Sequence, residues 1–218
     1  MSEYKVTSRT SMKRLPKRAV YDKQEIYGIL DEALICHVGF VQDGQPFVIP
    51  TIQVRIDDTL YIHGSAASRM LRTLGMGISA CVTVTLLDGL VLARSAFHHS
   101  MNYRSVVILG TLTNVDDPDE KRDVLDAIVE HTVPGRSAEA RGPNAQELKA
   151  TSVMSMEISE ASAKIRTGPP GDDDEDYALP VWAGVVPLTI QAGTPEDDPR
   201  LSDGVLVPDY LKTITRYA

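Results

Sequence analysis

The chain has 218 residues, of which 43% are hydrophobic, so it is long and apolar enough to bury a core as one domain. Thirty acidic against 22 basic residues give a formal net charge of -8, which argues against binding to nucleic acid or to an anionic membrane surface. No stretch approaches the roughly 20 consecutive apolar residues that a membrane-spanning helix needs.

Local signals near the start of the chain predict a polar arm followed by a helix. Residues 1–19 carry several bases but no apolar run, so we expect a solvated N-terminal arm and not a secretory signal. A helix is predicted over residues 22–33, because Asp22 and Glu25 form a capping-box pattern and the apolar residues that follow share one face.

Strand-like patterns dominate after this helix. The seven predicted strands are residues 34–42, 45–56, 59–63, 78–87, 90–95, 105–115 and 152–158. The dipeptides Asp43-Gly44 and Asp88-Gly89 each separate two of them and are typical of two-residue hairpin turns. Cys36 and Cys81 fall within apolar strands, where thiols are usually buried, and this usage fits a reducing cytoplasm.

Three short helices and a polar tail complete the prediction. Helical patterns cover residues 66–74, 117–133 and 144–150, and Asp117 is the expected cap of the second. Beyond Arg166 the chain is rich in proline, glycine and acidic residues, so residues 169–218 are predicted to form a loop-rich extension. Its apolar run around Trp182 should dock on the body of the protein or on a partner subunit.

The switch from strand to helix at residues 61–72 has the composition of a phosphate site. If the helix begins at Ser65, free backbone N–H groups, the Ser65 and Ser68 hydroxyls and the Arg69 guanidinium converge there. Arg72 would lie one turn further along the same face. The alternative is an ordinary capped surface helix with two solvated arginines, which the spacing alone slightly favours.

A second informative segment, residues 90–105, is polar and aromatic between two apolar strands. Its density of Arg94, His98, His99, Tyr103 and Arg104 favours a ligand-facing role, and the alternative is a polar connector. In an extended segment His98 and His99 point to different sides. Walker, Cys-x-x-Cys, His-Glu-x-x-His and Gly-x-Ser-x-Gly motifs are absent from the sequence. None of the five histidines pair at the helical spacing that a zinc site favours, so we do not expect metal catalysis.

The order of these motifs resembles the flavin-nucleotide-binding branch of the pyridoxamine 5′-phosphate oxidase-like family, including its nitroimidazole-reductase-like members. The motifs are His63-Gly-Ser-x-x-Ser-Arg69, Phe97-His-His-Ser-Met-Asn-Tyr-Arg-Ser105 and Lys164-Ile-Arg-Thr-Gly168. The resemblance implies a mainly β (α+β) fold, a split β-barrel of Greek-key type with six to seven antiparallel strands and short flanking helices. It assigns this domain to residues 20–168 and implies FMN bound at a homodimer interface, with both subunits lining each site.

The resemblance also implies roles for single residues. Ser68 and Arg69 match the pair that holds the FMN phosphate, and Met70 replaces a lysine of the vitamin B6 oxidases. Further cofactor-binding candidates are Ile49, Pro50, Thr51, Ile52, His63, Gly64, Ser65, Arg104, Ser105 and Trp182. The missing lysine, and the absence of the oxidases' C-terminal Trp and Arg/His pattern, argue against pyridoxamine-phosphate oxidase activity.

The sequence therefore predicts a cytoplasmic, homodimeric FMN-binding oxidoreductase that acts on a small molecule. His98 or His99 is the candidate for contacting the electron acceptor, since an imidazole donates a proton near neutral pH. Two alternatives stay open. The chain would bind haem through His98 or His99 as an axial ligand, or it would store or sense flavin without turnover.

Overall fold

The computed structural model describes residues 2–212 and 214. Its strands are β1 (Ala19–Val20), β2 (Ile35–Gln42), β3 (Gln45–Ile56), β4 (Thr59–Ser65), β5 (Ser79–Leu92), β6 (Ser100–Thr111), β7 (Thr113–Asn114), β8 (Thr151–Glu157), β9 (Ala161–Arg166) and β10 (Gly184–Pro187). Its helices are α1 (Lys23–Glu32), α2 (Arg69–Leu74), α3 (Pro118–Thr132), α4 (Ala145–Ala150) and α5 (Asp209–Lys212), with 3-10 turns η1 (Pro16–Arg18), η2 (Ala96–His98) and η3 (Asp174–Ala178).

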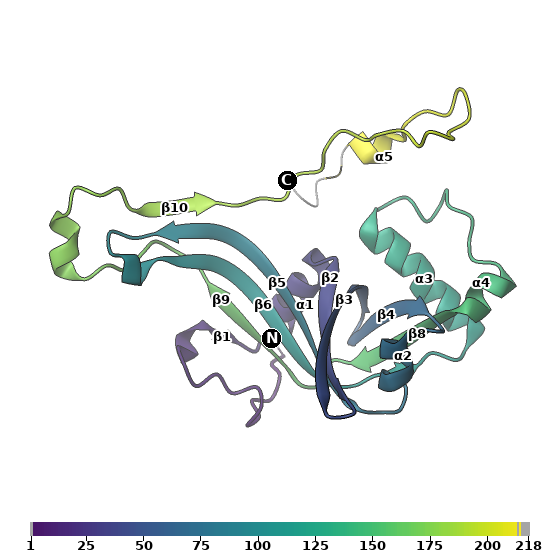
Figure 1. The fold of residues 1–218 in the computed structure, drawn as a ribbon, viewed down its shortest axis with the longest axis horizontal. Helices are drawn as coiled ribbons and strands as arrows, with labels where there is room; N and C mark the ends of the chain where they lie inside the picture. Colours follow the sequence, from purple (N-terminus) through teal and green to yellow (C-terminus); the bar gives the residue numbers. More distant parts are fainter. Residues whose placement is uncertain (1, 213, 215–218) are drawn as a thin grey trace.

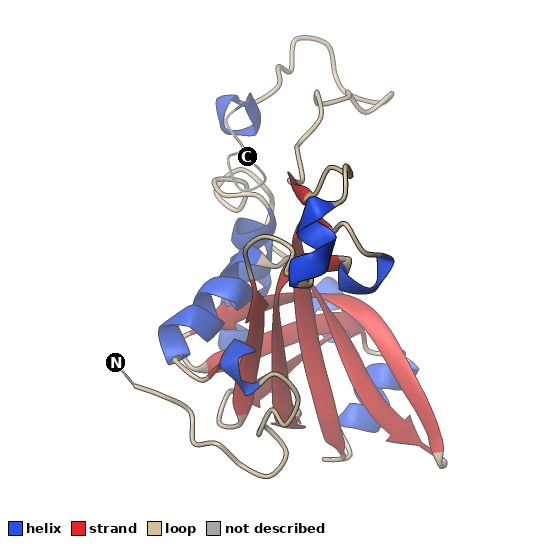
Figure 2. Cartoon of the chain, turned by 90° about the vertical axis from the view of Figure 1, so that its left-hand side faces the viewer, coloured by secondary structure: helices blue, strands red, loops and turns tan. Residues whose placement is uncertain are grey.

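In the described part of the chain, the ten strands form one antiparallel sheet that curves into a split barrel. The strand order is β1-β9-β6-β5-β2-β3-β4-β8-β7, and β10 pairs separately with β5. Figure 2 shows the strands as one curved layer with the helices on its flanks. The predicted fold class is therefore confirmed. No helix among residues 2–212 is long and apolar enough to span a membrane.

The split lies where β3 changes partner. Its first part pairs with β2 from Gln45 to Ile52, and its last four residues, from Gln53, pair with β4. Beyond Ile62, β4 leaves β3 and pairs with β8 alone, as far as Ser65 opposite Thr151. Residues 47–52 of β3 and the end of β4 are therefore not paired with each other, and we call this break in the sheet the barrel opening.

Helix α1 is predicted correctly and supplies a large share of the core. Asp22 caps it, since the Asp22 carboxylate accepts the Glu25 N–H at 3.1 Å. Ile26, Ile29 and Leu30 are at most 2% exposed and pack with alternate residues of β2, β5 and β6. Their burial, worth roughly 1.5–3 kcal/mol for each side chain, fixes α1 against the barrel.

The other predicted helices are also found. Asp117 caps α3 by accepting the N–H groups of Asp119 and Glu120, and Asn144 forms a capping box with α4. Val124 and Ile128 of α3 pack on Val153 of β8, in a second cluster outside the barrel. Odd-numbered residues of β4, which include His63, consequently face α3 and not the barrel interior.

The predicted turn at Asp88-Gly89 is wrong. β5 continues through these residues with a bulge, and the hairpin to β6 turns later, around η2. Gly89 allows β10 to approach closely, because a Cβ atom there would lie 3.0 Å from the Val186 carbonyl oxygen. Three strands outside the seven predicted ones, β1, β9 and β10, complete the sheet, and β6 begins at Ser100, five residues before its predicted start.

The ends of β5 and β6 leave the barrel as a ribbon, and β10 adds a third strand along β5 (Figure 1). We call residues 88–103 and 167–188 the arm. Beyond the arm the chain runs to α5, where the Tyr210 hydroxyl donates to Glu139 at 2.6 Å and accepts from Arg136 at 3.1 Å. The predicted extension thus contacts β5 through β10 and the loop after α3 through Tyr210.

Candidate functional site

The helix after β4 begins at Arg69, three residues after the predicted start at residue 66, so the helix start at Ser65 that the phosphate-site argument assumed is not found. The ladder to β8 holds Ser65 in the strand, and a turn follows in which the Ser68 N–H donates to the Ser65 carbonyl at 2.8 Å. The Ser65 hydroxyl accepts the Ala67 N–H, whereas Ser68 is the N-cap residue of α2. Ser68 and Arg69 remain adjacent at the helix start, but Ser65 does not belong to its first turn.

Arg69 is oriented toward β3 by an aromatic ring. Its guanidinium carbon lies 4.3 Å from the centroid of Phe47, and Phe47 stacks on Phe40 at 5.5 Å. In the part of the chain that the structure describes, no carboxylate forms an ion pair with Arg69. An exposed, unneutralised guanidinium in a fixed position is suited to bind a phosphate in two places.

Gly64 allows α2 to lie close to the end of β4. A Cβ atom at Gly64 would lie 3.1 Å from the Leu71 Cδ1 atom, so a larger residue would require the Leu71 side chain to shift. A second link is the Thr73 hydroxyl, which donates to the Gln42 side chain of β2 at 3.0 Å. Together these contacts position Arg69 beside the opening of the barrel.

Residues 49–52 of β3 border the same opening. The side chains of Ile49 and Thr51 are half-buried, whereas those of Pro50 and Ile52 are exposed on the outer face of the sheet. Alternate backbone groups of an antiparallel strand point to opposite sides. β4 does not pair with residues 49–52 of β3. Half of the backbone N–H and C=O groups of these residues are therefore directed to the opening, where they would contact the edge of a planar ligand.

His63 adjoins this site through its backbone only. Its imidazole lines a cavity of about 350 Å³ on the other side of β4, with Ile128, Arg141 and Glu147 among the lining residues. Within residues 2–212, the buried Nδ1 atom of His63 has no hydrogen-bond partner. Burial lowers the pKa of His63, so the side chain is neutral at neutral pH.

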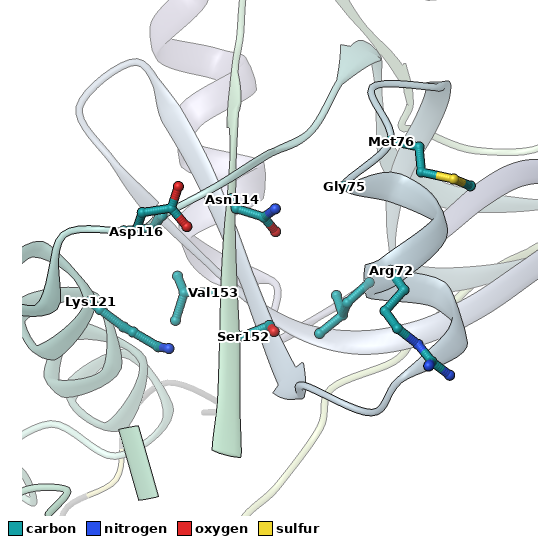
Figure 3. A pocket seen from close by; sticks show the side chains of 10 residues that line it. Arg72, Gly75, Met76, Asn114, Asp116, Lys121, Ser152 and Val153 are labelled. Carbon is teal, nitrogen blue, oxygen red and sulfur yellow. The ribbon is translucent and has the colours of Figure 1, made fainter. Parts of the chain in front are cut away.

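Arg72 lies on another cavity, of about 360 Å³, lined also by Asn114, Asp116, Lys121 and Ser152. Figure 3 shows the Arg72 guanidinium pointing away from Asp116 and Lys121. Lys121 donates to the Leu148 carbonyl at 2.6 Å, which ties α3 to α4. Arg72 and Lys121 thus do not point at one another across this cavity (Figure 3), and the alignment of Arg72 with Arg69 stays a prediction.

Arg104 and Ser105 lie on β6, between the barrel and the arm. The Arg104 guanidinium pairs with Glu32 and with Asp88, and hydrogen bonds to these two carboxylates raise the pKa of Arg104. The Ser105 hydroxyl donates to the Lys164 carbonyl at 3.4 Å. Both side chains thus have partners within the protomer, and a contact with a cofactor stays a prediction.

The two histidines of the arm differ in their contacts. The His98 Nε2 atom lies 3.3 Å from an Asp173 carboxylate oxygen, whereas the His99 Nδ1 atom lies 3.0 Å from the Ser95 carbonyl oxygen. Trp182, 65% exposed, precedes β10. Figure 1 shows η2 and β10 at the opposite end of the molecule from α2. One protomer therefore separates the predicted site residues into a group at the barrel opening and a group on the arm.

Sequence reasoning missed two residues. Phe47 was visible only as one apolar residue of a strand, and its contact with Arg69 depends on how α2 packs against β3. Asp172 was part of an acidic run assigned to solvent, yet its carboxylate is buried and accepts the N–H groups of Arg94 and Ser95. No local sequence signal distinguishes Asp172 from the acidic residues that follow it.

Comparisons with known proteins agree with this geometry. The family profile described as pyridoxamine 5′-phosphate oxidase matches residues 22–165. A solved structure of the flavocytochrome Anf3 from Azotobacter vinelandii is 44% identical, with a TM-score of 0.89, and the match covers 94% of this chain and 96% of that one. An FAD- and haem-binding protein from Mycobacterium smegmatis is 40% identical, with a TM-score of 0.86 and coverage of 89% and 96%.

A third solved structure matches less of the chain. It is a protein from Bacteroides thetaiotaomicron described as a 5-nitroimidazole antibiotic resistance protein, with 25% identity, a TM-score of 0.58 and coverage of 67% of this chain and 86% of that one. No protein with a curated description matches the chain. The first two matches therefore also cover most of the residues outside the family profile. The match to the Bacteroides protein covers 67% of this chain and leaves the rest without a counterpart.

Proposed function

The chain belongs to the pyridoxamine 5′-phosphate oxidase family of flavin-binding proteins, and from this premise we propose that it is a flavin-dependent oxidoreductase acting on a small molecule. Ser68 and Arg69 would hold the flavin phosphate, and residues 49–52 would border the ring. The observation that carries this proposal is Arg69, which is exposed, without a carboxylate partner in the described residues, and held over Phe47 at the barrel opening.

The bound flavin would supply the electron transfer, and the protein would bind and orient it. FAD is our choice of flavin, because the 40% identical mycobacterial protein is described as binding FAD. FMN, which the family resemblance implied, is the alternative. Both carry a phosphate on the ribityl chain, so the role proposed for Arg69 is the same for either.

We further propose that the protein is a homodimer in which two subunits complete each site. The outer face of β2 and β3 carries exposed apolar side chains, among them Ile35 at 53% and Val48 at 67% exposure. Ile35 lies opposite Ile52, which borders the proposed flavin site. A second copy would cover this face, and its arm would bring His98 and His99 to a site that lacks them within one protomer. Cytoplasmic location stays a prediction from the cysteine usage.

Analysis of the purified full chain tests the function. We expect a yellow protein whose released cofactor is identified by chromatography and mass spectrometry, and whose flavin is bleached by a reduced nicotinamide and recovers with an acceptor. Flavin that binds but never cycles would support the storage alternative. Colourless protein that takes up neither FAD nor FMN would contradict the proposal.

Haem binding alongside the flavin is the second candidate function. The observation that favours it is the pair of long matches, because one of those proteins is a flavocytochrome and the other is described as binding FAD and haem. An intense Soret band in the purified or haem-reconstituted protein would distinguish this function from flavin binding alone.

A further inference from the structure

The cavity beside His63 has no role in the proposed flavin function. It lies between β4, α3 and the loop of residues 133–144, on the side of β4 that faces away from the barrel interior, and we call it the α3 cavity. Its volume of about 350 Å³ is within the range of small-molecule sites. One wall is apolar and consists of Leu125, Ile128 and Val129 of α3. An apolar wall beside a few polar groups is the usual composition of a ligand pocket.

The loop that forms a second wall of the α3 cavity is held in place by the protein itself. The Glu130 carboxylate accepts the Gly135 N–H and the Ser137 hydroxyl, both at 2.7 Å. Arg141 donates to both carboxylate oxygens of Glu147, at 3.0 and 2.8 Å. Because these contacts exist before any ligand binds, the ordering cost of binding in the cavity is small.

Two polar groups that line the α3 cavity lack a partner within the described chain. One is the buried Nδ1 atom of His63, and the other is the carboxylate of Asp126, which is exposed and forms neither an ion pair nor a hydrogen bond there. The remaining polar groups are engaged, since Glu147 pairs with Arg141 and the Thr151 hydroxyl donates to the Glu147 carbonyl at 2.9 Å. Buried polar atoms in folded proteins nearly always have a partner, so we expect a molecule to bind at the Nδ1 atom.

The charges in the α3 cavity select the kind of molecule. Arg141 and Glu147 neutralise each other, which leaves the negative charge of Asp126. His63 is neutral at neutral pH, because burial lowers its pKa, and a neutral imidazole accepts a hydrogen bond on one of its nitrogens. Both groups therefore accept hydrogen bonds. An organic cation with N–H donors on an apolar body matches them, whereas Asp126 would repel an anion.

From this arrangement we propose that the α3 cavity binds a small organic cation, an amine or amidine, whose N–H groups donate to Asp126 and to the Nδ1 atom of His63. The apolar body of the ligand lies on the wall that α3 provides. The site is separate from the proposed flavin site, because the His63 side chain faces α3 while the flavin phosphate is assigned to Ser68 and Arg69 beyond the end of β4. The proposal therefore does not depend on flavin binding.

Isothermal titration calorimetry of the full chain with three matched probes tests the proposal. Benzamidine, benzamide and benzoate share a phenyl ring and carry a cationic, a neutral and an anionic group. We expect benzamidine to bind about two- to fivefold more tightly than benzamide, a modest difference because the Asp126 carboxylate is exposed to solvent. Benzoate should bind more weakly than either. No binding of benzamidine, or binding of benzoate as tight as that of benzamidine, would overturn the proposal.

Two variants test the contact with Asp126. Asp126→Asn should bind benzamidine no more tightly than benzamide, because the charge that favours the cation is lost. Asp123→Asn removes the same charge from an exposed position of α3 that does not line the cavity, and it should keep the preference for benzamidine. Loss of the preference in both variants would assign it to the net charge of the protein and would contradict the contact.

The contact with His63 is tested by His63→Leu, which should weaken the binding of benzamidine by about tenfold, because a hydrogen bond from a charged donor is lost. The nitrogen NMR resonances of the His63 imidazole give a second measurement that needs no substitution, since a hydrogen bond to Nδ1 shifts them. Resonances that stay in place while benzamidine binds would overturn the proposal. Flavin content, measured in the same samples after release, shows separately whether the flavin proposal holds.

Discussion

The guanidinium of Arg69 lies 4.3 Å from the centre of the Phe47 ring, and this contact joins the start of α2 to the strand at the barrel opening. The two residues lie on different elements, and the pairing of β3 with β4 begins only at Gln53, beyond Phe47. The contact keeps a permanent positive charge in place before any ligand binds, which reduces the ordering cost of binding a phosphate.

We predict that Arg69→Glu loses the flavin without unfolding the protein. The change places a negative charge where the phosphate would bind. Because Arg69 is exposed, the substitution should change the free energy of unfolding little. Flavin content per chain and circular dichroism measure the two effects. Arg72→Glu is the matched control and should retain the cofactor. Equal flavin content in both variants would show that Arg69 does not hold the phosphate.

Removing only the aromatic contact should have a smaller effect. Phe47→Leu keeps an apolar side chain but removes the ring under Arg69, and cation–π contacts at exposed sites contribute roughly 0.5–1 kcal/mol. We expect the dissociation constant of the flavin to rise by about two- to fivefold, measured by fluorescence titration of the apoprotein. An unchanged constant would mean that Phe47 does not position Arg69.

Local signals predicted the parts of the fold whose causes are local. Asp22, Asp117 and Asn144 each cap the helix that the sequence assigned to them. The turn at Asp43-Gly44 is also found, with both residues at positive φ as such a hairpin requires. In each case the decisive interaction joins residues within four positions of one another, so the sequence pattern contains it.

The errors arise where distant segments decide the structure. Asp88-Gly89 has the composition of a hairpin turn, but β10, about 100 residues later, pairs with this part of β5 and keeps it extended. Ser65 has the composition of a helix start, but pairing with Thr151 retains it in β4. For the candidate site the same limit applies, because Ser68 and Arg69 are recognisable in sequence whereas Phe47 is not.

The proposed dimer makes the outer face of β2 and β3 sensitive to charge. Val48→Asp should convert the protein to a monomer, because a carboxylate would be buried without a partner in the interface. Light scattering after size exclusion should give twice the chain mass of 23.8 kDa for the unchanged protein and the single mass for the variant. Ile190→Asp, at a residue with similar exposure in the extension, is the control and should stay dimeric. A monomeric unchanged protein would contradict the proposal.

Gln53 is a fully buried polar residue that joins β3 to the end of α1. Its amide nitrogen donates to the carbonyls of Leu30 and Ala33 at 2.7 and 2.5 Å. Gln53→Leu should lower the free energy of unfolding by about 1–3 kcal/mol, because two buried carbonyl groups lose a donor. Gln53→Glu should lower the free energy of unfolding further at neutral pH, since a carboxylate would face those carbonyls. The difference in stability between Gln53→Glu and Gln53→Leu should shrink in acid. Urea unfolding measures both, and equal stability of all three proteins would contradict the assigned role.

The buried His63 should make stability depend on pH. Its pKa is lowered by burial from the usual 6.5, so below about pH 6.5 the unfolded chain takes up a proton that the folded chain does not bind. The free energy of unfolding should therefore fall as the pH drops through this range. In His63→Gln the fall between pH 7.5 and pH 5.5 should be smaller than in the unchanged protein. An equal fall in the two proteins would show that His63 does not contribute.

Asp172 should control the order of the arm. Its carboxylate accepts the N–H groups of Arg94 at 2.9 Å and Ser95 at 3.1 Å and pairs with the Arg94 guanidinium. Burial alone would raise the pKa of Asp172, but these N–H groups and the guanidinium stabilise the carboxylate, and the pKa lies below its usual value. The charged form is therefore the one that holds this segment.

Asp172→Asn replaces one acceptor oxygen with an NH₂ group that faces backbone N–H groups, so we expect the segment around Arg94 to open more often. Trypsin should cleave after Arg94 several-fold faster in this variant, while the urea midpoint of the barrel changes little. Asp174→Asn, at an exposed position two residues away, is the control. Identical cleavage rates in the two variants would show that Asp172 does not hold the arm.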